Sequence, residues 1–299
     1  MNKTDKKQKS KILQMIFLAI KGFIIGIANV IPGVSGGTLA LVLGIYEDLI
    51  DSISHFISKF KKSISFLIPV LIGIILAFLS MSHVVTYCLD NYLFATVMLF
   101  FGAVLGGMPM LTKVIKKEKV TFSRILILIL TFAFTIGLLF INKGNANVSL
   151  EHITFTNILL WILIGAIASA TMVIPGVSGS AFLMTIGYYE PIMNTVKSLT
   201  LSDTSKGHAI AVVCIFGVGV VLGIAGISKL IDFLLKKYRI STFWGIIGFV
   251  LASALVIIIQ NLFFGGISNN LAGTSVIEYI LGIALFFGGF FMAYKLGDK

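Results

Sequence analysis

Long apolar stretches separated by short polar segments dominate the chain. Six of these stretches come close to the roughly 20 residues that a helix needs to cross a bilayer. They lie at residues 63–83, 92–110, 122–141, 209–231, 241–260 and 276–295. The pattern predicts an all-α polytopic membrane protein.

Two further apolar stretches carry nearly the same sequence. Residues 30–47 read VIPGVSGGTLALVLGIYE, and residues 173–190 read VIPGVSGSAFLMTIGYYE. After Ser35 the apolar run 38–46 would form roughly 14 Å of helix, about half of the ~30 Å hydrocarbon core. The run before the motif, 22–31, is about equally short. Each copy therefore predicts a re-entrant hairpin, in which two half-length helices meet at a Pro-Gly loop.

The distribution of lysine and arginine between the spans predicts the topology. With the N-terminus in the cytoplasm and the first hairpin returning to that side, three basic clusters fall inside: 59–62, 113–124 and 236–239. The segments expected outside contain few basic residues. Each half then has a returning hairpin plus three crossings, and this odd number inverts the second half relative to the first.

The chain is therefore predicted to consist of two inverted-topology repeats, residues 1–150 and 151–299. The first hairpin is expected to enter from the cytoplasm and the second from outside, with the C-terminus in the cytoplasm. A weak similarity extends beyond the motif, because YLFATVMLFFG at 92–102 parallels YRISTFWGIIG at 238–248. The repeats are thus expected to share their fold as well as the motif.

The composition agrees with a membrane location. Of 299 residues, 58% are hydrophobic and 12% are charged, and the mean hydropathy is +1.05. A soluble domain is about 45–50% apolar and about 25% charged. The net charge of +11 is mostly accounted for by the expected cytoplasmic loops, so it predicts no nucleic-acid partner.

The N-terminus imitates a signal peptide, since basic residues precede a short apolar run. Lys21 interrupts that run, and apolar sequence resumes without a small-residue cleavage box. The segment is therefore predicted to stay attached.

Cysteine and histidine usage predicts neither a metal site nor a cofactor. Cys88 and Cys214 are too few for a disulfide framework, and no CxxC pair occurs. The four histidines are scattered among expected helix ends and loops: His55, His83, His152 and His208. We interpret them as interfacial side chains.

The repeated motif is the candidate functional site. In lipid, irregular backbone survives only where it is buried in protein or lines a wet cavity. Proline and small residues would break the helices near the membrane midplane, and the arm after the break would then offer N–H groups and a positive dipole end to an anion. Two such ends from inverted hairpins would form one pocket. The expected binding residues are Ser35, Gly36, Gly37 and Thr38 in the first copy and Ser178, Gly179 and Ser180 in the second.

Close helix packing is the alternative interpretation of the motif, because small residues let helix backbones touch. A single copy would not distinguish the two interpretations. Two copies in inverted, half-length hairpins favour the binding site.

Four charged residues flank the copies. Lys21 and Lys197 are candidate phosphate contacts, although snorkelling towards the interface is the simpler interpretation. Glu47 and Glu190 close the two copies and are candidates for proton coupling. About 18 Å of helix would separate Ser35 from Glu47, so an interfacial carboxylate explains Glu47 equally well.

The doubled VIPGVSGG/VIPGVSGS motif, the following Tyr-Glu and the length resemble a bacterial membrane family long labelled as a domain of unknown function. Its members are described as polyprenyl-phosphate transporters of the PopT type. The resemblance covers essentially the whole chain. It implies translocation of undecaprenyl phosphate, the lipid carrier of cell-wall precursors, from the outer to the inner leaflet of the bacterial cytoplasmic membrane for reuse. It supplies no residue roles.

Two other functions remain open at this point. A membrane-embedded undecaprenyl-pyrophosphate phosphatase would need charge stabilisation, a nucleophile and an acid/base. The only arginines, Arg124 and Arg239, lie in expected cytoplasmic loops, and no histidine lies near the motif, so we expect no enzyme. A transporter of a small soluble anion could use the same helix ends. The coupling ion and the oligomeric state are not predicted.

Overall fold

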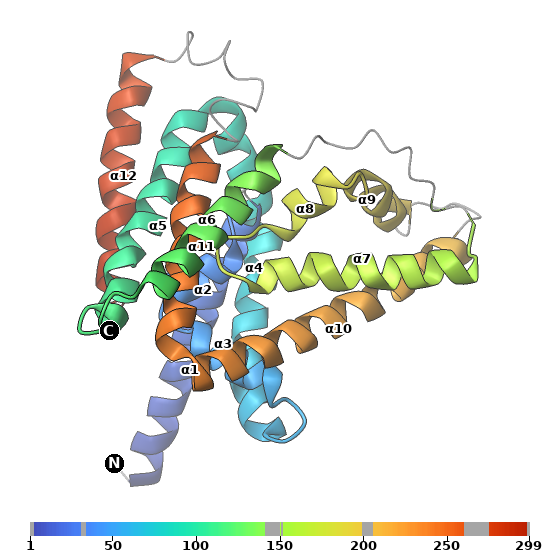
Figure 1. The fold of residues 1–299 in the computed structure, drawn as a ribbon, viewed down its shortest axis with the longest axis horizontal. Helices are drawn as coiled ribbons and strands as arrows, with labels where there is room; N and C mark the ends of the chain where they lie inside the picture. The colour runs from blue at the N-terminus through green and yellow to red at the C-terminus, as the bar shows by residue number, and fades with distance from the viewer. Residues whose placement is uncertain are drawn as a thin grey trace.

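The computed structural model describes residues 3–30, 34–140, 150, 152–198, 206–259 and 275–297, and most of these residues are helical. Twelve helices are described within these ranges (Figure 1). The first six are α1 (Lys3–Val30), α2 (Gly36–Val42), α3 (Tyr46–Ser54), α4 (Phe60–Asn91), α5 (Leu93–Ile115) and α6 (Phe122–Phe140). The other six are α7 (Phe155–Val173), α8 (Gly179–Thr185), α9 (Tyr189–Ser198), α10 (Lys206–Lys237), α11 (Arg239–Ile258) and α12 (Val276–Gly297).

Eight of the described helices are long and apolar enough to cross a membrane: α1, α4, α5, α6, α7, α10, α11 and α12. The prediction of a polytopic, all-α protein is thereby confirmed for the described residues.

The first arms of the two motif copies are longer than predicted. Helix α1 has 28 residues and α7 has 19, so the expected half-length first arms were wrong. Lys21 lowers the local hydropathy but stays inside α1, and the residues at 158–173 contain no charge that would end α7. The second arms are short as predicted, since α2 and α8 have seven residues each.

Helices α1 and α4 run parallel and touch through glycine. A Cβ added at Gly22 would collide with the carbonyl oxygen of Val70, and one at Gly26 would lie 2.8 Å from the carbonyl oxygen of Ile74. From the first contact to the second, the residue number increases by four in both helices, so the two helices run in the same direction. Because α4 follows α1 in the chain, the segment that contains α2 and α3 has to run back to the side where α1 began.

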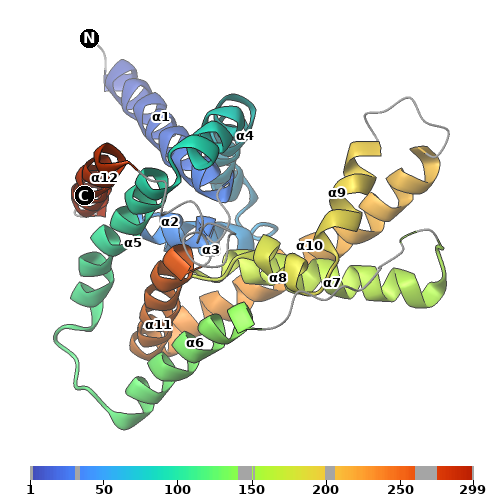
Figure 2. The same ribbon diagram turned by 90° about the horizontal axis from the view of Figure 1, so that it is seen from above.

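Helices α7 and α10 repeat this arrangement in the second half of the chain. Gly219 lies against the carbonyl oxygen of Ile162, and Gly223 lies against that of Ala166. Here too the residue number increases by four in both helices, so α7 and α10 are parallel. Figure 2 shows the two helices side by side, projecting away from α1 and α4.

Helices α5 and α12 form a third close pair, and α6 packs along α11. Gly102 and Gly106 of α5 meet the carbonyl oxygens of Phe286 and Phe290 in α12. Helix α11 is the most buried of the candidate spans. Together with α5 and α11, the short helix α2 lies in the main hydrophobic core.

Candidate functional site

Residues 34–43 of the first copy of the motif are enclosed by protein. Every residue of α2 is buried, and Ser35, which precedes it, is 3% exposed. The Ser35 backbone is extended, and its carbonyl oxygen accepts hydrogen bonds from the N–H groups of Thr38 and Leu39 at 3.1 and 3.3 Å. Its side chain does not cap the helix. The helix therefore begins at a polar residue whose hydroxyl is not used to start it.

The Ser35 hydroxyl is buried and has no hydrogen-bond partner among the described residues. An unsatisfied buried polar group costs about 1–3 kcal/mol, and such a group in a native structure calls for an explanation. A ligand oxygen would supply the missing partner.

The structure brings the second copy against the first. The Gly176 N–H donates to Thr38 Oγ1 at 2.7 Å, and this bond is buried. A Cβ added at Gly37 would lie 3.1 Å from the Val173 carbonyl oxygen, and the Tyr46 hydroxyl donates to the same oxygen at 3.2 Å. Residues 127 and 138 positions apart in the sequence thus meet at one point. Pro32 and Gly33 of the first copy lie outside the described residues.

Gly176 is fixed by its backbone and by its neighbour. Its φ is +85°, in the left-handed region that residues with a Cβ rarely adopt. A Cβ there would also collide with the carbonyl oxygen of Phe249 in α11. This turn after Pro175 aims the Gly176 N–H at Thr38, so glycine is needed for the contact between the copies.

The second copy has a different polar arrangement. The hydroxyls of Ser178 and Ser180 lie 3.0 Å apart and bond to each other. Gly179 lies between them, and a Cβ added to it would be 2.5 Å from the carbonyl oxygen of Ala168. The sequence aligns Ser180 with Gly37, and it aligns Thr38 with an alanine. The two copies therefore differ in their hydroxyl groups and in the bonds that these make.

Lys21 lies at the opposite end of α2 from Ser35. Its Nζ donates to the carbonyl oxygen of Leu43 at 2.7 Å, and a cation at this end complements the helix dipole. Seven residues of helix, about 10 Å, separate it from the N-terminus of α2. The side chain of Lys197 lies outside the described part of the chain.

The two candidate proton-coupling carboxylates have different surroundings. Glu47 Oε1 lies 2.8 Å from Arg239 Nη2 at the start of α11, and both side chains are about half exposed. Glu190 is exposed in the first turn of α9. Sequence reasoning placed Arg239 in a loop without a partner and missed this ion pair, because 192 residues separate the two groups.

Sequence reasoning also missed the roles of Thr38 and Tyr46 in joining the copies. The sequence offered one signal for the role of Thr38, which is that the second copy has an alanine at the equivalent position. A residue that only shaped the turn would be expected in both copies.

The comparisons with known proteins cover most of the chain. The sequence profile of the undecaprenyl phosphate translocase-like family matches residues 25–264. The chain belongs to this family. It is 32% identical over 284 residues to the polyprenyl-phosphate transporter of Staphylococcus aureus, covering 93% of this chain and 94% of the relative. It is 30% identical over 257 residues to the polyprenyl-phosphate transporter of Vibrio cholerae, covering 81% and 77%.

No solved structure matches the chain. The family, the bacterial relatives and the eight hydrophobic helices identify a multi-pass bacterial membrane protein. This agrees with the expected localisation.

Proposed function

We propose that this protein transports a polyprenyl phosphate, moving the head group of undecaprenyl phosphate from the outer to the inner leaflet so that the carrier can be reused in cell-wall synthesis. The observation that carries the proposal is the buried Ser35 hydroxyl without a described partner, next to the contact between the two motif copies. The printed names of both relatives, polyprenyl-phosphate transporter, supply the substrate class.

A phosphate monoester suits this position chemically. Its oxygens accept hydrogen bonds, and bonds to a charged acceptor are stronger than neutral ones. The Ser35 hydroxyl would donate to it, together with backbone N–H groups at Gly36 and Gly37. On the second copy, the proposed contacts are Ser178, Gly179 and Ser180, whose hydroxyl pair would open towards the head group. The isoprenoid tail would stay in the lipid throughout.

Inverted repeats at 1–150 and 151–299 are part of the proposal. Parallel packing of α1 on α4, and of α7 on α10, supports a returning segment in each half. The turn between α3 and α4 lies near the end of α10, since His55 Nε2 is 3.8 Å from Asp232 Oδ2. Helix α10 in the second half corresponds to α4 in the first half, so the start of α4 lies on the same side of the protein as the end of α10. Counterparts that run in opposite directions are expected for an inverted relation.

The proposed cycle alternates access to the motif. The head group enters from the outer side near the second copy, is held between the copies, and leaves inward when the halves rock. The bonds from Gly176 to Thr38 and from Tyr46 to Val173 would then break and re-form. Lys21 and Lys197 would assist at the two sides as secondary phosphate contacts, and Glu47 or Glu190 would carry a coupled proton.

The proposal is a transporter and not an enzyme. Arg124 pairs with Glu118 at 3.7 Å and Arg239 pairs with Glu47 at 2.8 Å. Both arginines of the chain are thus engaged with carboxylates, which argues against a role in stabilising a transferring phosphoryl group. Release of phosphate from undecaprenyl pyrophosphate by the purified protein would favour the phosphatase instead.

Reconstitution in liposomes tests the function directly. The protein is expected to move undecaprenyl phosphate between leaflets, as read by a leaflet-specific probe with and without a pH gradient. Excess lipid phosphate should compete, whereas inorganic phosphate should not. Competition by inorganic phosphate alone would replace the proposal with transport of a small soluble anion.

Single-cysteine labelling in cells tests the inverted topology. With Cys88 and Cys214 replaced, a cysteine at Ser58 is expected to be labelled from the cytoplasm and one at Ser205 from outside. A cysteine at Lys237, which follows the end of the predicted inward crossing, serves as a same-side control for Ser58. Labelling of Ser58 and Ser205 from the same side would contradict the inverted repeats.

A further inference from the structure

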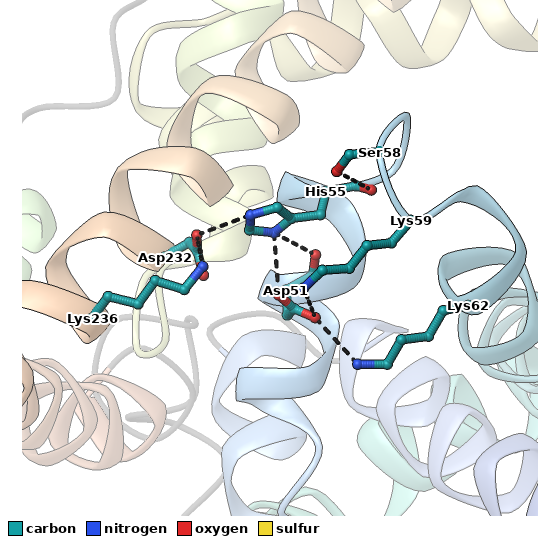
Figure 3. Close-up of polar contacts among 7 residues, drawn as sticks. All are labelled: Asp51, His55, Ser58, Lys59, Lys62, Asp232 and Lys236. Atoms are coloured by element: carbon teal, nitrogen blue, oxygen red, sulfur yellow. Dashed lines mark hydrogen bonds and ion pairs between the residues drawn. The ribbon is translucent and has the colours of Figure 1, made fainter.

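A histidine lies between two carboxylates from different halves of the chain, at the C-terminal end of α3 (Figure 3). Nδ1 of His55 is 3.1 Å from Asp51 Oδ1 in α3, and Nε2 is 3.8 Å from Asp232 Oδ2 in α10. All three residues are partly buried. The imidazole ring therefore forms a polar link between α3 and α10.

The protonation of Nδ1 follows from its neighbours. Besides the Asp51 carboxylate, Nδ1 lies 3.2 Å from the backbone carbonyl oxygen of Asp51. Both groups accept hydrogen bonds and neither donates, so Nδ1 carries a proton in the neutral ring as well as in the charged one. The state of Nε2 then decides the contact with Asp232. A protonated Nε2 donates a hydrogen bond to this carboxylate, whereas an unprotonated Nε2 faces it with a lone pair and cannot donate.

Three lysines complete the cluster. Lys59 Nζ lies 2.9 Å and Lys62 Nζ 3.5 Å from the Asp51 carboxylate, and Lys236 Nζ lies 2.7 Å from Asp232. The hydrogen bond from Lys59 is the main reason why the pKa of Asp51 is lowered from its ordinary value. A carboxyl group with a lowered pKa stays ionised over the whole range in which imidazole changes charge, between about pH 5 and 8.

The other end of α3 is also joined to the second half. The Tyr46 hydroxyl donates to the last residue of α7, Val173, and Glu47 pairs with Arg239 of α11. Polar contacts at both ends therefore hold α3 against three helices of the second half. Among these contacts, the one between His55 and Asp232 depends on whether the imidazole Nε2 carries a proton.

We infer that His55 is a positioning residue, which fastens α3 to α10 when Nε2 is protonated and releases that end of α3 when it is not. The inference concerns the linkage between the halves and does not depend on the identity of the transported lipid. A metal ion is the competing explanation, because ligand atoms of Asp51, His55 and Asp232 lie within 4.8 Å of one another. The ring turns its nitrogens to different carboxylates, and lysines already pair with both carboxylates, so a bridge fits the geometry better.

Hydrogen exchange of the purified full-length protein in detergent tests this inference. After correction for intrinsic exchange rates, the amides of α3 are expected to be about two- to fivefold better protected at pH 5.5 than at pH 8. This factor corresponds to the free energy of a partly exposed ion pair, which is up to about 1 kcal/mol. His55→Gln should give the weaker protection at both pH values, and His55→Arg the stronger. Asp232→Asn should remove the pH dependence while leaving His55 in place.

His83→Gln is the matched control, because it removes an exposed histidine of α4 elsewhere in the protein. The inference is overturned if His55→Gln keeps the wild-type pH dependence, or if His83→Gln abolishes it. It is also overturned in favour of a metal site if Zn²⁺ protects α3 in the wild type but not in His55→Gln.

Discussion

Replacing Ser35 by alanine is expected to lower the rate of undecaprenyl phosphate transport by about ten- to a hundredfold, without loss of stability. The expected loss corresponds to a hydrogen bond to a charged group, worth about 1.5–3 kcal/mol. In the structure the Ser35 hydroxyl is buried with no described partner, so alanine removes no described contact. The midpoint of thermal unfolding should therefore stay unchanged or rise slightly, while transport in liposomes falls.

This combination separates a ligand contact from a structural role. Ser63→Ala is the matched control, because Ser63 is 1% exposed and its hydroxyl also has no described partner, yet it lies at the start of α4 and not at the motif. It should leave transport at the wild-type rate. Wild-type transport by Ser35→Ala, with the protein folded, would show that Ser35 does not bind the head group. Ser178→Ala is expected to have a smaller effect on transport, since its hydroxyl is shared with Ser180.

Replacing Gly176 by alanine is expected to destabilise the protein by about 2–5 kcal/mol. The left-handed backbone costs a residue with a Cβ about 1–2 kcal/mol, and forcing an atom into a packed site costs about 1–3 kcal/mol more. The new methyl group would meet the Phe249 carbonyl oxygen and push the Gly176 N–H away from Thr38. The unfolding midpoint in detergent and the yield of folded protein from membranes should both fall.

The control for this substitution is Gly217→Ala. Gly217 lies inside α10 and an added Cβ there meets nothing within 4 Å. Alanine is favoured over glycine inside a helix by about 1 kcal/mol, so the control should be neutral or stabilising. A Gly176→Ala protein as stable as the control would mean that the turn after Pro175 is not held in the left-handed conformation.

The large features of the fold follow from patterns that a sequence displays directly. Long apolar runs identified six of the eight candidate spans, and the doubled motif identified the two segments that meet at Thr38 and Gly176. The remaining two spans, α1 and α7, were underestimated. Lys21 lowers the local hydropathy of α1, and α7 was expected to be short because its copy of the motif was interpreted in the same way as the first. In the structure Lys21 continues the helix and bonds to the carbonyl oxygen of Leu43.

The tertiary partners of the site could not be read from the sequence. Tyr46 was recognised only as part of the motif, and Glu47 as a candidate for proton coupling. Nothing local in the sequence indicates that they reach Val173 and Arg239. Contacts of this kind depend on how helices cross in three dimensions. Hydrophobic periodicity says which face of a helix is apolar, but it does not say which other helix covers that face.

The glycine contacts in the pairs α1–α4 and α7–α10 have a consequence for how the protein can move. At these glycines the backbone of one helix lies against the backbone of the other, which leaves little room for the two helices to slide past each other. Packed interfaces of this kind shift as whole units. Each pair should therefore move as one rigid unit, and a displacement of one half of the protein against the other should be concentrated at the hydrogen bonds and ion pairs that join the two halves.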